Sequence, residues 1–371
     1  MAAMEKNKTN LNVPHLRFPE FSGEWVTAQL GDVCKFFSGG TPSSTNKDFY
    51  DGNIPFIRSG EIHSCSTELH ISESGLNSSS AKIVEQGDLL LALYGATSGD
   101  IAISKIKGAI NQAVLCIRTN HDVFFLKSCW EKHCEKFLQT YLQGGQGNLS
   151  AEIIKSIKMA FPSCSEQKKI SGLLTLIEDR ITTQKKIIEK YESLIRGLCE
   201  KLTRQCTTNK TIAECLECHS STLQESAVLD AGSYPVYGAI GICGYTDTPD
   251  VSGDGILIIK DGASVGVTYF ADGSYSSIGT LNRLTAKEDI NLRYIYYCLK
   301  VLNFTPYKTG LAIPHIYFKD YGKHKIWCPP LEQQSSIADA LTTIDNKIQV
   351  EKSLLEQLNS QKRYMLNQLF I

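Results

Sequence analysis

A long apolar repeat begins with the residues Pro162–Ser163–Cys164–Ser165–Glu166–Gln167–Lys168–Lys169–Ile170. The same opening returns 167 positions later as Pro329–Pro330–Leu331–Glu332–Gln333–Gln334–Ser335–Ser336–Ile337. Both copies continue without a gap for about forty residues. An internal repeat predicts two like units and hence a pseudo-symmetric molecule, which suits a target with two parts.

The apolar residues of both copies recur at alternating steps of four and three, which is the heptad pattern of a coiled coil. The first copy has Ile170, Leu174, Ile177, Ile181, Ile188, Tyr191, Ile195, Leu198 and Leu202. The second copy has Ile337, Leu341, Ile344, Ile348, Leu355, Leu358, Met365 and Leu369. Gln184 and Glu351 interrupt the two seams at the same step, and Lys362 interrupts only the second. We therefore predict two long helices packed as an antiparallel coiled coil; the alternative is that each helix packs on a separate globular core.

Composition limits the class of protein. The 371 residues include 38 Lys and Arg against 39 Asp and Glu, so any nucleic-acid-binding surface has to be local. No apolar run reaches about 18 residues, which argues against a membrane span. The polar residues 1–15 are predicted to be a disordered leader and not a signal peptide. Without an export signal, the 13 scattered cysteines indicate reduced thiols and a cytoplasmic location.

A β-rich block precedes each helical segment, and both blocks show the same order of motifs. Each has a short apolar run typical of a buried strand, then a glycine turn, an amphipathic helix and a glycine-containing loop. These motifs lie at 87–94, 95–99, 124–142 and 144–148 in the first block, and at 253–260, 262–266, 292–302 and 309–315 in the second. The first block carries about fifteen extra residues near its start.

The predicted fold class is therefore α+β, with two pseudo-symmetric β-rich domains joined by two long paired helices. The predicted parts are a leader (1–15), a first β-rich domain (16–161), a first helical region (162–205), a second β-rich domain (206–328) and a second helical region (329–371).

Catalytic signatures are missing from the sequence. It has neither the Asn/Asp-Pro-Pro-Tyr/Phe stretch of an adenine methyltransferase nor a Gly-x-x-x-x-Gly-Lys-Ser/Thr phosphate loop. Pro249–Asp250 precedes Lys260, but Ile258 stands where a nuclease of the Pro-Asp…Asp/Glu-x-Lys kind needs an acid. Cys215–Leu216–Glu217–Cys218–His219 has the spacing of a haem-attachment motif, which requires export, and no second such pair completes a zinc site. We interpret this segment as a plain strand, like Cys34–Lys35–Phe36–Phe37 of the first block.

Polar side chains in the turns of both blocks are candidates for DNA contacts. Arg and Lys can pair with guanine edges, Asn and Gln with adenine, and hydroxyls or loop amides can hold phosphates. The predicted contacts are Thr41, Arg58, Ser59, Tyr94, Thr97, Gln112, Gln146 and Asn148 in the first block, and Tyr237, Lys260, Asp261, Ser264 and His315 in the second. Asn111–Gln112 is predicted to lie within a strand, and Lys260–Asp261 to mirror Tyr94. Each residue alone is better explained as a solvated loop side chain, so the prediction rests on equivalent loops occurring twice.

In their order and double occurrence, these motifs resemble the specificity subunit of a Type I restriction–modification system. The resemblance extends from residue 16 to residue 371. It rests on the two Pro-x-x-x-x-Gln-x-x-Ile openings, on Leu16–Arg17–Phe18–Pro19 with Trp25 and Leu30–Gly31–Asp32–Val33, and on Gly39–Gly40–Thr41–Pro42–Ser43 with Asn53–Ile54–Pro55–Phe56.

The resemblance implies that each block is a target recognition domain that reads one half of a bipartite double-stranded DNA target. It also implies that the helices dock two methylation subunits, through which restriction subunits join the complex. No catalytic centre, cofactor or metal is then expected in this chain, because S-adenosylmethionine, ATP and magnesium act on the partner subunits.

We expect the paired helices to fix the distance between the two domains, and with it the length of an unread spacer in the DNA. The alternative from another class is a cytoplasmic coiled-coil interaction scaffold without DNA specificity, and a third is a fused restriction–methylation enzyme. The missing export signal and the missing catalytic motifs favour the first interpretation. The near-neutral charge suggests that partners supply much of the phosphate contact.

Overall fold

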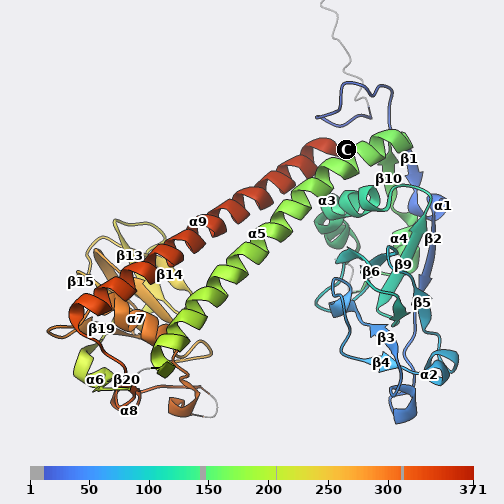
Figure 1. The fold of residues 1–371 in the computed structure, drawn as a ribbon. Coiled ribbons are helices and arrows are strands. Elements are labelled where there is room, and N and C mark those ends of the chain that lie inside the picture. Colours follow the sequence, from blue (N-terminus) through green and yellow to red (C-terminus); the bar gives the residue numbers. More distant parts are fainter. Residues whose placement is uncertain (1–11, 143–147, 206, 311–312) are drawn as a thin grey trace, which may run out of the picture. The chain divides into compact units, whose positions relative to one another are not determined.

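The computed structural model describes residues 12–142, 148–205, 207–310 and 313–371, without the side chains of 142 and 202–205. The chain divides into two compact units, Met1–Thr183 with Leu355–Ile371, and Gln184–Leu354. Each unit holds one β-rich block and parts of both long helices, α5 (Cys164–Gln205) and α9 (Leu331–Leu369) (Figure 1). The predicted α+β class is therefore confirmed, whereas the predicted leader lies largely outside the described residues.

Small antiparallel and mixed sheets make up the first block. Strands β1 (Val26–Gln29) and β10 (Lys158–Phe161) pair antiparallel, so the two ends of the block meet. A second sheet has the order β2 (Cys34–Ser38), β9 (Val114–Thr119), β6 (Leu89–Ala92), β7 (Ile101–Ile103). A third has the order β4 (His70–Ile71), β3 (Ile54–Ile57), β8 (Gly108–Ile110), β5 (Lys82–Val84). The helical segments are α1 (Leu30–Val33), η1 (Lys47–Phe49), η2 (Ser59–Glu61), α2 (Glu73–Asn77), α3 (Val123–Leu142) and α4 (Ala151–Ser156).

The second block is built in the same way. Its two ends meet through β11 (Lys210–Thr211) and β20 (Lys325–Ile326). One four-stranded sheet has the order β12 (Leu216–Ser220), β19 (Leu281–Ala286), β16 (Gly255–Ile259), β17 (Thr268–Ala271). The other has the order β14 (Gly241–Thr246), β13 (Tyr234–Gly238), β18 (Ser274–Ser277), β15 (Val251–Ser252). The helical segments are α6 (Ile212–Cys215), η3 (Glu225–Ala227), α7 (Leu292–Lys300), η4 (Thr305–Tyr307) and α8 (Phe318–Tyr321).

The two blocks share one topology. Their sheets match strand for strand, and β3 runs parallel to β8 just as β13 runs parallel to β18. Strands β9 and β19 keep the 167-residue offset at every position, so the repeat extends from the helices through the sheets. Most of the extra residues of the first block lie between β3 and β6, where α2 and β5 are inserted or lengthened. The predicted common plan is confirmed.

One predicted strand segment is wrong. Asn111 follows β8, and Gln112 lies in a turn before β9 begins. The Asn111 side-chain Oδ1 accepts a hydrogen bond from the Ala113 N–H at 3.1 Å. An Asn side chain that binds the backbone two residues on forms a turn and competes with the strand ladder. Gln112 is consequently presented at the end of the sheet and not along it.

In the first unit, the start of α5 packs on the end of α9 in antiparallel direction (Figure 1). The predicted seam residues of this unit lie in one core cluster: Ile170, Leu174, Ile177, Ile181, Leu355, Leu358, Met365 and Leu369. Lys362 interrupts this seam, and its Nζ forms ion pairs of 2.8 Å with Glu131 and 2.6 Å with Glu178. The predicted pairing is thus confirmed here, with the seam lysine neutralised by two acids.

In the second unit, the two polar interruptions of the seam meet. Gln184 Nε2 donates a hydrogen bond to the Glu351 carbonyl oxygen at 3.0 Å and another to the Glu351 carboxylate. The apolar seam residues around this pair are buried or half-buried: Ile188, Tyr191, Ile195, Ile337, Leu341, Ile344 and Ile348. The hydrogen-bonded pair of Gln184 and Glu351 therefore fixes the register of the two helices.

The far end of the first seam differs from the heptad prediction. Leu198 is exposed, at 36%, whereas Cys199 is buried, at 3%. A straight helix has 3.6 residues per turn, so a strict 3.5-residue repeat drifts around its surface by about 20° per heptad. The buried position has moved on by one residue here. The side chain of the predicted seam residue Leu202 lies outside the described residues.

The glutamine of each repeated opening has the same structural role. Gln167 Nε2 donates to the Pro162 carbonyl oxygen at 2.9 Å, and its Oε1 accepts from the Asp122 N–H at 3.0 Å. Gln334 does the same with the Pro329 carbonyl oxygen, at 2.8 Å, and the Asn291 N–H, at 2.8 Å. Asp122 and Asn291 immediately precede α3 and α7, so each buried amide ties a long helix to the neighbouring helix of its block.

Replacing Gln334 with alanine is expected to lower the urea midpoint of unfolding, because a buried N–H and a buried carbonyl lose their partner. Each unsatisfied buried group costs about 1–3 kcal/mol of unfolding free energy. Gln333→Ala is the matched control, since Gln333 is the exposed neighbour of the same type. Equal losses for the two variants, measured by circular dichroism, would show that helix propensity and not the buried amide causes the effect.

Candidate nucleic-acid interface

Several loops of the first block gather at one end of its sheets. They follow β2, β3, β6 and β8, and the segment before α4 joins them. Backbone hydrogen bonds hold them together: Gly40 N–H to Ile110 O (3.3 Å), Asn111 N–H to Ile57 O (3.3 Å), Leu93 N–H to Ala113 O (2.9 Å) and Leu149 N–H to Leu93 O (2.8 Å). We call this cluster the first loop end. A Cβ on Gly39 would lie 1.7 Å from the Ile110 carbonyl oxygen, so the glycine is needed for this close approach.

The second block repeats this arrangement as the second loop end. Three of the backbone hydrogen bonds recur at equivalent positions: Ile278 N–H to Tyr237 O (2.9 Å), Lys260 N–H to Thr280 O (3.0 Å) and Ile316 N–H to Lys260 O (3.0 Å). A fourth, Gly279 N–H to Leu223 O (2.8 Å), joins the same two loops as Gly40 N–H to Ile110 O, but with the donor on the other loop. The glycine turns also match: Gly95, Gly99, Gly262 and Gly266 all have φ between 83° and 97°. Equivalent loops therefore meet twice, as the sequence prediction required.

The predicted DNA contacts of the first block differ in how accessible their side chains are. Thr41 Oγ1 donates a hydrogen bond to Gln112 Oε1, and both side chains are exposed. The Arg58 guanidinium is held by Glu61, at 2.9 Å, and by Glu68, and these carboxylates raise the pKa of Arg58 further. Arg58 therefore has to leave two acids before it can contact DNA, whereas Thr41 and Gln112 are accessible.

The remaining candidates of the first block flank its glycine turn. Tyr94 is half-buried, and burial raises the pKa of its phenol. Ser59 and Thr97 are also half-buried, and Asn148 is exposed. Gln146 lies outside the described residues. Their contacts with DNA stay a prediction.

In the second block, a polar pair joins two loops. His315 Nδ1 is bonded to the Asp261 carboxylate, and the two residues also form a β-bridge. Ser264 is exposed in the neighbouring glycine turn, and Tyr237 packs edge-on against Tyr275 with ring centroids 5.7 Å apart. The structure thus places all five candidates at or beside the second loop end, where Lys260 and Tyr237 also take part in its backbone hydrogen bonds.

The fifth, Lys260, corrects the predicted correspondence between the blocks. Lys260 N–H bonds the Thr280 carbonyl oxygen just as Leu93 N–H bonds that of Ala113. Lys260 is therefore equivalent to Leu93, and Asp261 alone is equivalent to Tyr94. The 167-residue offset agrees with this hydrogen-bond register, so only Asp261 of the predicted pair mirrors Tyr94.

Sequence reasoning missed a polar cavity at the second loop end. It has a volume of about 390 Å³, and residues 219–223 line one side of it. The sequence indicates a plain strand at His219, and His219 does lie in β12, the counterpart of β2. The signal available in the sequence was the hydroxyl run Ser220–Ser221–Thr222 directly after that strand.

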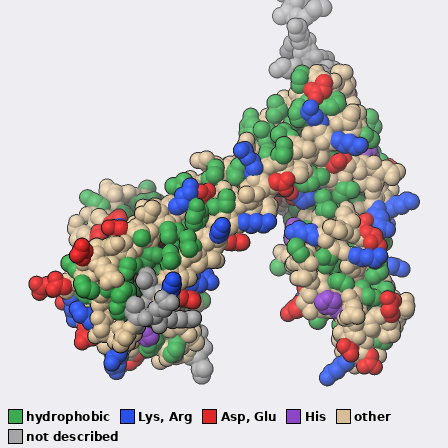
Figure 2. All heavy atoms as spheres, viewed as in Figure 1, with side chains coloured by type: hydrophobic (Ala, Val, Ile, Leu, Met, Phe, Trp, Pro, Cys, Tyr) green, Lys and Arg blue, Asp and Glu red, His purple; other side chains and the backbone are tan. Residues whose placement is uncertain are grey.

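A cluster of paired charges joins the helices of the first unit. In the first unit, Lys127 and Lys362 each bridge the same two acids, Glu131 and Glu178, at 2.6–2.8 Å. Although burial opposes it, the two lysines lower the pKa of Glu178. Figure 2 likewise shows basic and acidic side chains interspersed on the visible face of the molecule. A single-sign surface for DNA is not visible on this face.

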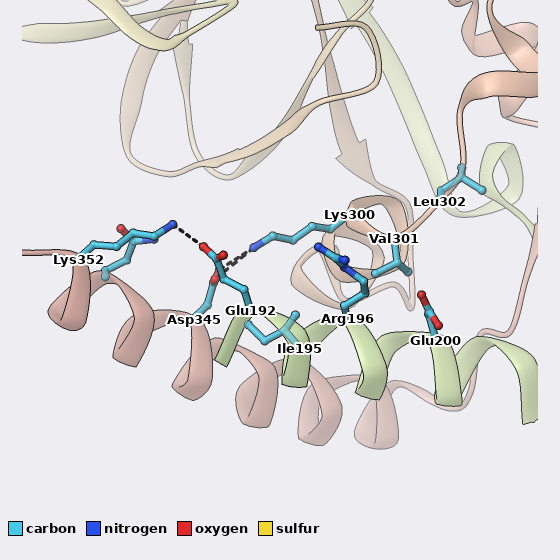
Figure 3. A pocket seen from close by; sticks show the side chains of 10 residues that line it. Glu192, Ile195, Arg196, Glu200, Lys300, Val301, Leu302, Asp345 and Lys352 are labelled. Carbon is cyan, nitrogen blue, oxygen red and sulfur yellow. Dashed lines mark hydrogen bonds and ion pairs between the residues drawn. The ribbon is translucent and has the colours of Figure 1, made fainter. Parts of the chain in front are cut away.

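A groove of about 420 Å³ lies beside α5 and α9 in the second unit (Figure 3). Lys300 pairs with Asp345 at 3.1 Å, and Lys352 pairs with Glu192 at 2.8 Å. The side chain of Arg196 also lines the groove. Because acids and bases alternate along it, the groove suits a polar protein surface better than a phosphate chain.

The described residues contain no group of three or more His, Cys, Asp or Glu side chains placed to hold a metal ion. In the same part of the chain, none of the helices is both long and apolar enough to cross a membrane. Cys215 ends α6 as a free thiol, and Cys218 and His219 lie in β12. The interpretation of this segment as a strand is confirmed for Leu216–His219, whereas it is wrong for Cys215, which lies in α6.

The chain resembles known proteins over nearly its whole length. The family model described as "Type I restriction modification DNA specificity domain" matches residues 22–193 and 208–360. The MjaVIII specificity subunit of Methanocaldococcus jannaschii is 25% identical over 95% of this chain and 92% of that protein. The EcoR124I/EcoR124II specificity subunit of Escherichia coli is 24% identical over 51% of this chain and 46% of that protein.

Solved structures show the same fold. The S subunit of a Type I restriction–modification system from M. genitalium superposes with a TM-score of 0.67, at 17% identity, over 97% of this chain and 99% of that chain. Both blocks match one family model, and both have one topology. The chain belongs to the family of Type I restriction–modification DNA specificity subunits and carries two copies of its domain.

Proposed function

We propose that this chain selects the DNA sequence on which a Type I restriction–modification complex acts. Each block reads one half of a bipartite duplex target with its loop end. The observation that carries the proposal is the doubled loop end: two blocks of one topology gather equivalent polar loops and glycine turns, and three backbone hydrogen bonds recur at equivalent positions. The alternative of a scaffold without DNA specificity has no such support, because both blocks match the DNA specificity domain.

The helices supply the second part of the proposal. α5 and α9 each contribute residues to both units, and in each unit they pack against one another. A rod that is held by a continuous seam resists bending and so limits the distances at which two blocks can contact one duplex. We infer that its length sets the unread spacer between the two half-sites.

The partners of the chain are proposed to be double-stranded DNA, two methylation subunits and, through these, restriction subunits. Large apolar side chains on α5 and α9 that face solvent support a protein partner on the helices: Leu176, Leu194, Val350, Leu354 and Tyr364. Methyl transfer from S-adenosylmethionine and magnesium- and ATP-dependent cleavage then belong to the partner subunits, and this chain is a non-catalytic subunit. The complex acts in the cytoplasm, where the DNA is.

Purifying the tagged full chain from its native host is expected to bring down an adenine-N6 DNA methyltransferase. Removing the chain should abolish adenine methylation at one discontinuous sequence in the host genome, and restoring it should return that methylation. Methylation-sensitive sequencing of the three strains reads both results. A continuous methylated sequence, or methylation that survives removal of the chain, would contradict the proposal.

A further inference from the structure

The internal repeat allows each residue of one block to be compared with its counterpart in the other. Phe37 of β2 faces Cys116 of β9, and the corresponding partners in the second block are His219 of β12 and Arg283 of β19. The pair Ile57–Ile110 likewise corresponds to Tyr237–Ser277. Three apolar positions of the first block, 37, 110 and 116, are therefore polar in the second.

The surroundings of these positions differ in the same way. Ile110 and Cys116 are fully buried in an apolar cluster, and Phe37 packs against it. Their counterparts His219, Ser277 and Arg283 instead line the 390 Å³ cavity, which we call the hydroxyl pocket. Polar groups that line a cavity in place of apolar ones weaken the core unless they bind something, because their hydrogen bonds to water are partly lost.

The chemistry of the hydroxyl pocket fits a phosphate group. Arg283 supplies guanidinium donors and forms no ion pair with an Asp or Glu among the described residues. Hydroxyls of Ser220, Ser221, Thr222 and Ser277 line the same space, and His219 binds Thr285 through one ring nitrogen at 3.0 Å. Arginine and hydroxyl groups are common partners of DNA phosphates, whereas no Phe, Tyr or Trp lines the pocket to stack on a base.

One group in the pocket opposes an anion. Asp250 lines the pocket with an exposed carboxylate, and its backbone N–H is held by Ser276 Oγ at 2.9 Å. A negative charge at the mouth weakens phosphate binding by like-charge repulsion, which water and salt reduce at an exposed site. Removing this charge should therefore strengthen binding, whereas removing Arg283 should weaken it.

The hydroxyl pocket also lies at the second loop end, where DNA contacts are proposed. Leu223, which lines it, accepts a hydrogen bond from the Gly279 N–H at the second loop end. We infer that the hydroxyl pocket binds one backbone phosphate of the DNA contacted by the second block, with Arg283 as its principal ligand and no counterpart in the first block. This inference rests on the proposed function, because it assumes that the second loop end meets DNA.

The test uses the full chain assembled with its methylation subunits. Binding is measured by fluorescence anisotropy over a range of salt concentrations, on a duplex with the methylated site and on a duplex of unrelated sequence. Arg283→Ala should weaken binding to both duplexes by a similar factor, about five- to tenfold at low salt, and should reduce the salt slope by about 0.9. Arg293→Ala is the matched control, since Arg293 lies on α7, pairs with Asp272 and does not line the pocket.

Two further variants distinguish the loss of a phosphate ligand from misfolding of the chain. Asp250→Asn should tighten binding to both duplexes, a gain that a misfolded chain does not produce. The triple variant His219→Phe, Ser277→Ile, Arg283→Cys installs the residues that pack in the first block, so it should keep the thermal unfolding midpoint and lose the same affinity as Arg283→Ala.

The outcomes separate the inference from the proposed function. Unchanged affinity and salt slope in Arg283→Ala would overturn the phosphate pocket while the unaltered complex still bound its site. Relaxed specificity at a single base pair, with binding to the unrelated duplex unchanged, would show that Arg283 reads a base and would also overturn it. Failure of the unaltered complex to prefer the methylated site would instead refute the proposed function.

Discussion

Exchanging residues 16–161 for the first block of a family member with another target is expected to change one half of the methylated DNA sequence completely. The physical reason is that the polar loops of a block are held by that block's own sheets. Every backbone hydrogen bond of the first loop end joins residues between Gly40 and Leu149. The other half of the target should stay unaltered, because no residue of the second loop end is exchanged.

The exchange has one structural condition. Trp25 and Phe125 of the block pack on Phe370, directly after α9, with Phe125 and Phe370 ring centroids 5.0 Å apart, and Phe161 packs on Phe125. The donor block therefore has to supply large apolar residues at these three positions, or the first unit loses core packing worth about 3–5 kcal/mol for each aromatic removed. Thermal unfolding of the chimaera checks this condition before the genome is sequenced.

Sequencing methylated adenines in the host then reads the outcome. The reciprocal exchange of residues 207–328 is the matched control and should change only the opposite half. A change in both halves after a single exchange would contradict independent reading, provided that the chimaera unfolds at the same temperature as the unaltered chain.

The paired helices α5 and α9 could be predicted from the sequence because the heptad pattern depends only on nearby residues. Heptad spacing depends on neighbours three and four residues apart, and the predicted seam residues from Ile170 to Ile195 are buried where the spacing places them, except Tyr191, which is half-buried. The failure at Leu198 is also local, since the helix drifts against the strict repeat. The role of Gln167 and Gln334 was not accessible in this way, because their partners Asp122 and Asn291 lie more than forty residues away.

The candidate interface was predicted less well because it depends on register between distant strands. The apolar spacing predicts a strand at Gln112, because a turn made by the Asn111 side chain does not change that spacing. The hydroxyl pocket escaped notice because His219 meets Arg283 only through the pairing of β12 with β19. A fixed offset of 167 residues does not identify the counterpart of His219 either. The extra residues between β3 and β6 change the offset for every strand before β6.

Lengthening both helices by one heptad is expected to lengthen the unread spacer of the methylated sequence. Seven residues add about 10.5 Å at about 1.5 Å per residue. This equals about three base pairs at about 3.4 Å each. Seven residues also equal two turns of a 3.5-residue repeat, so the seam stays continuous. The insertions belong between Thr183 and Gln184 and between Leu354 and Leu355, where one compact unit ends and the other begins, so that contacts within each unit are kept.

A longer spacer also rotates the second half-site around the duplex, which limits how well both blocks can bind at once. Three base pairs turn the second half-site by about 100° around the duplex, because a full turn takes about 10.5 base pairs. The inserted heptad turns the helices by only about 20°. We therefore expect methylation at the longer spacer to be slower than methylation by the unaltered complex, but shifted in the same direction. Single-molecule sequencing of methylated DNA gives the spacer length and the extent of methylation together.

Two control variants separate length from other effects. Lys185→Ala with Lys186→Ala changes exposed residues of α5 beside the insertion point without changing its length, and the spacer should stay the same. A four-residue insertion in α5 alone shifts Gln184 away from Glu351 and puts the seams out of register, so this variant should unfold at a lower temperature. If the doubly lengthened chain folds and methylates at the original spacer, the rod does not set the spacing, and flexible joints between the blocks and the helices must do so.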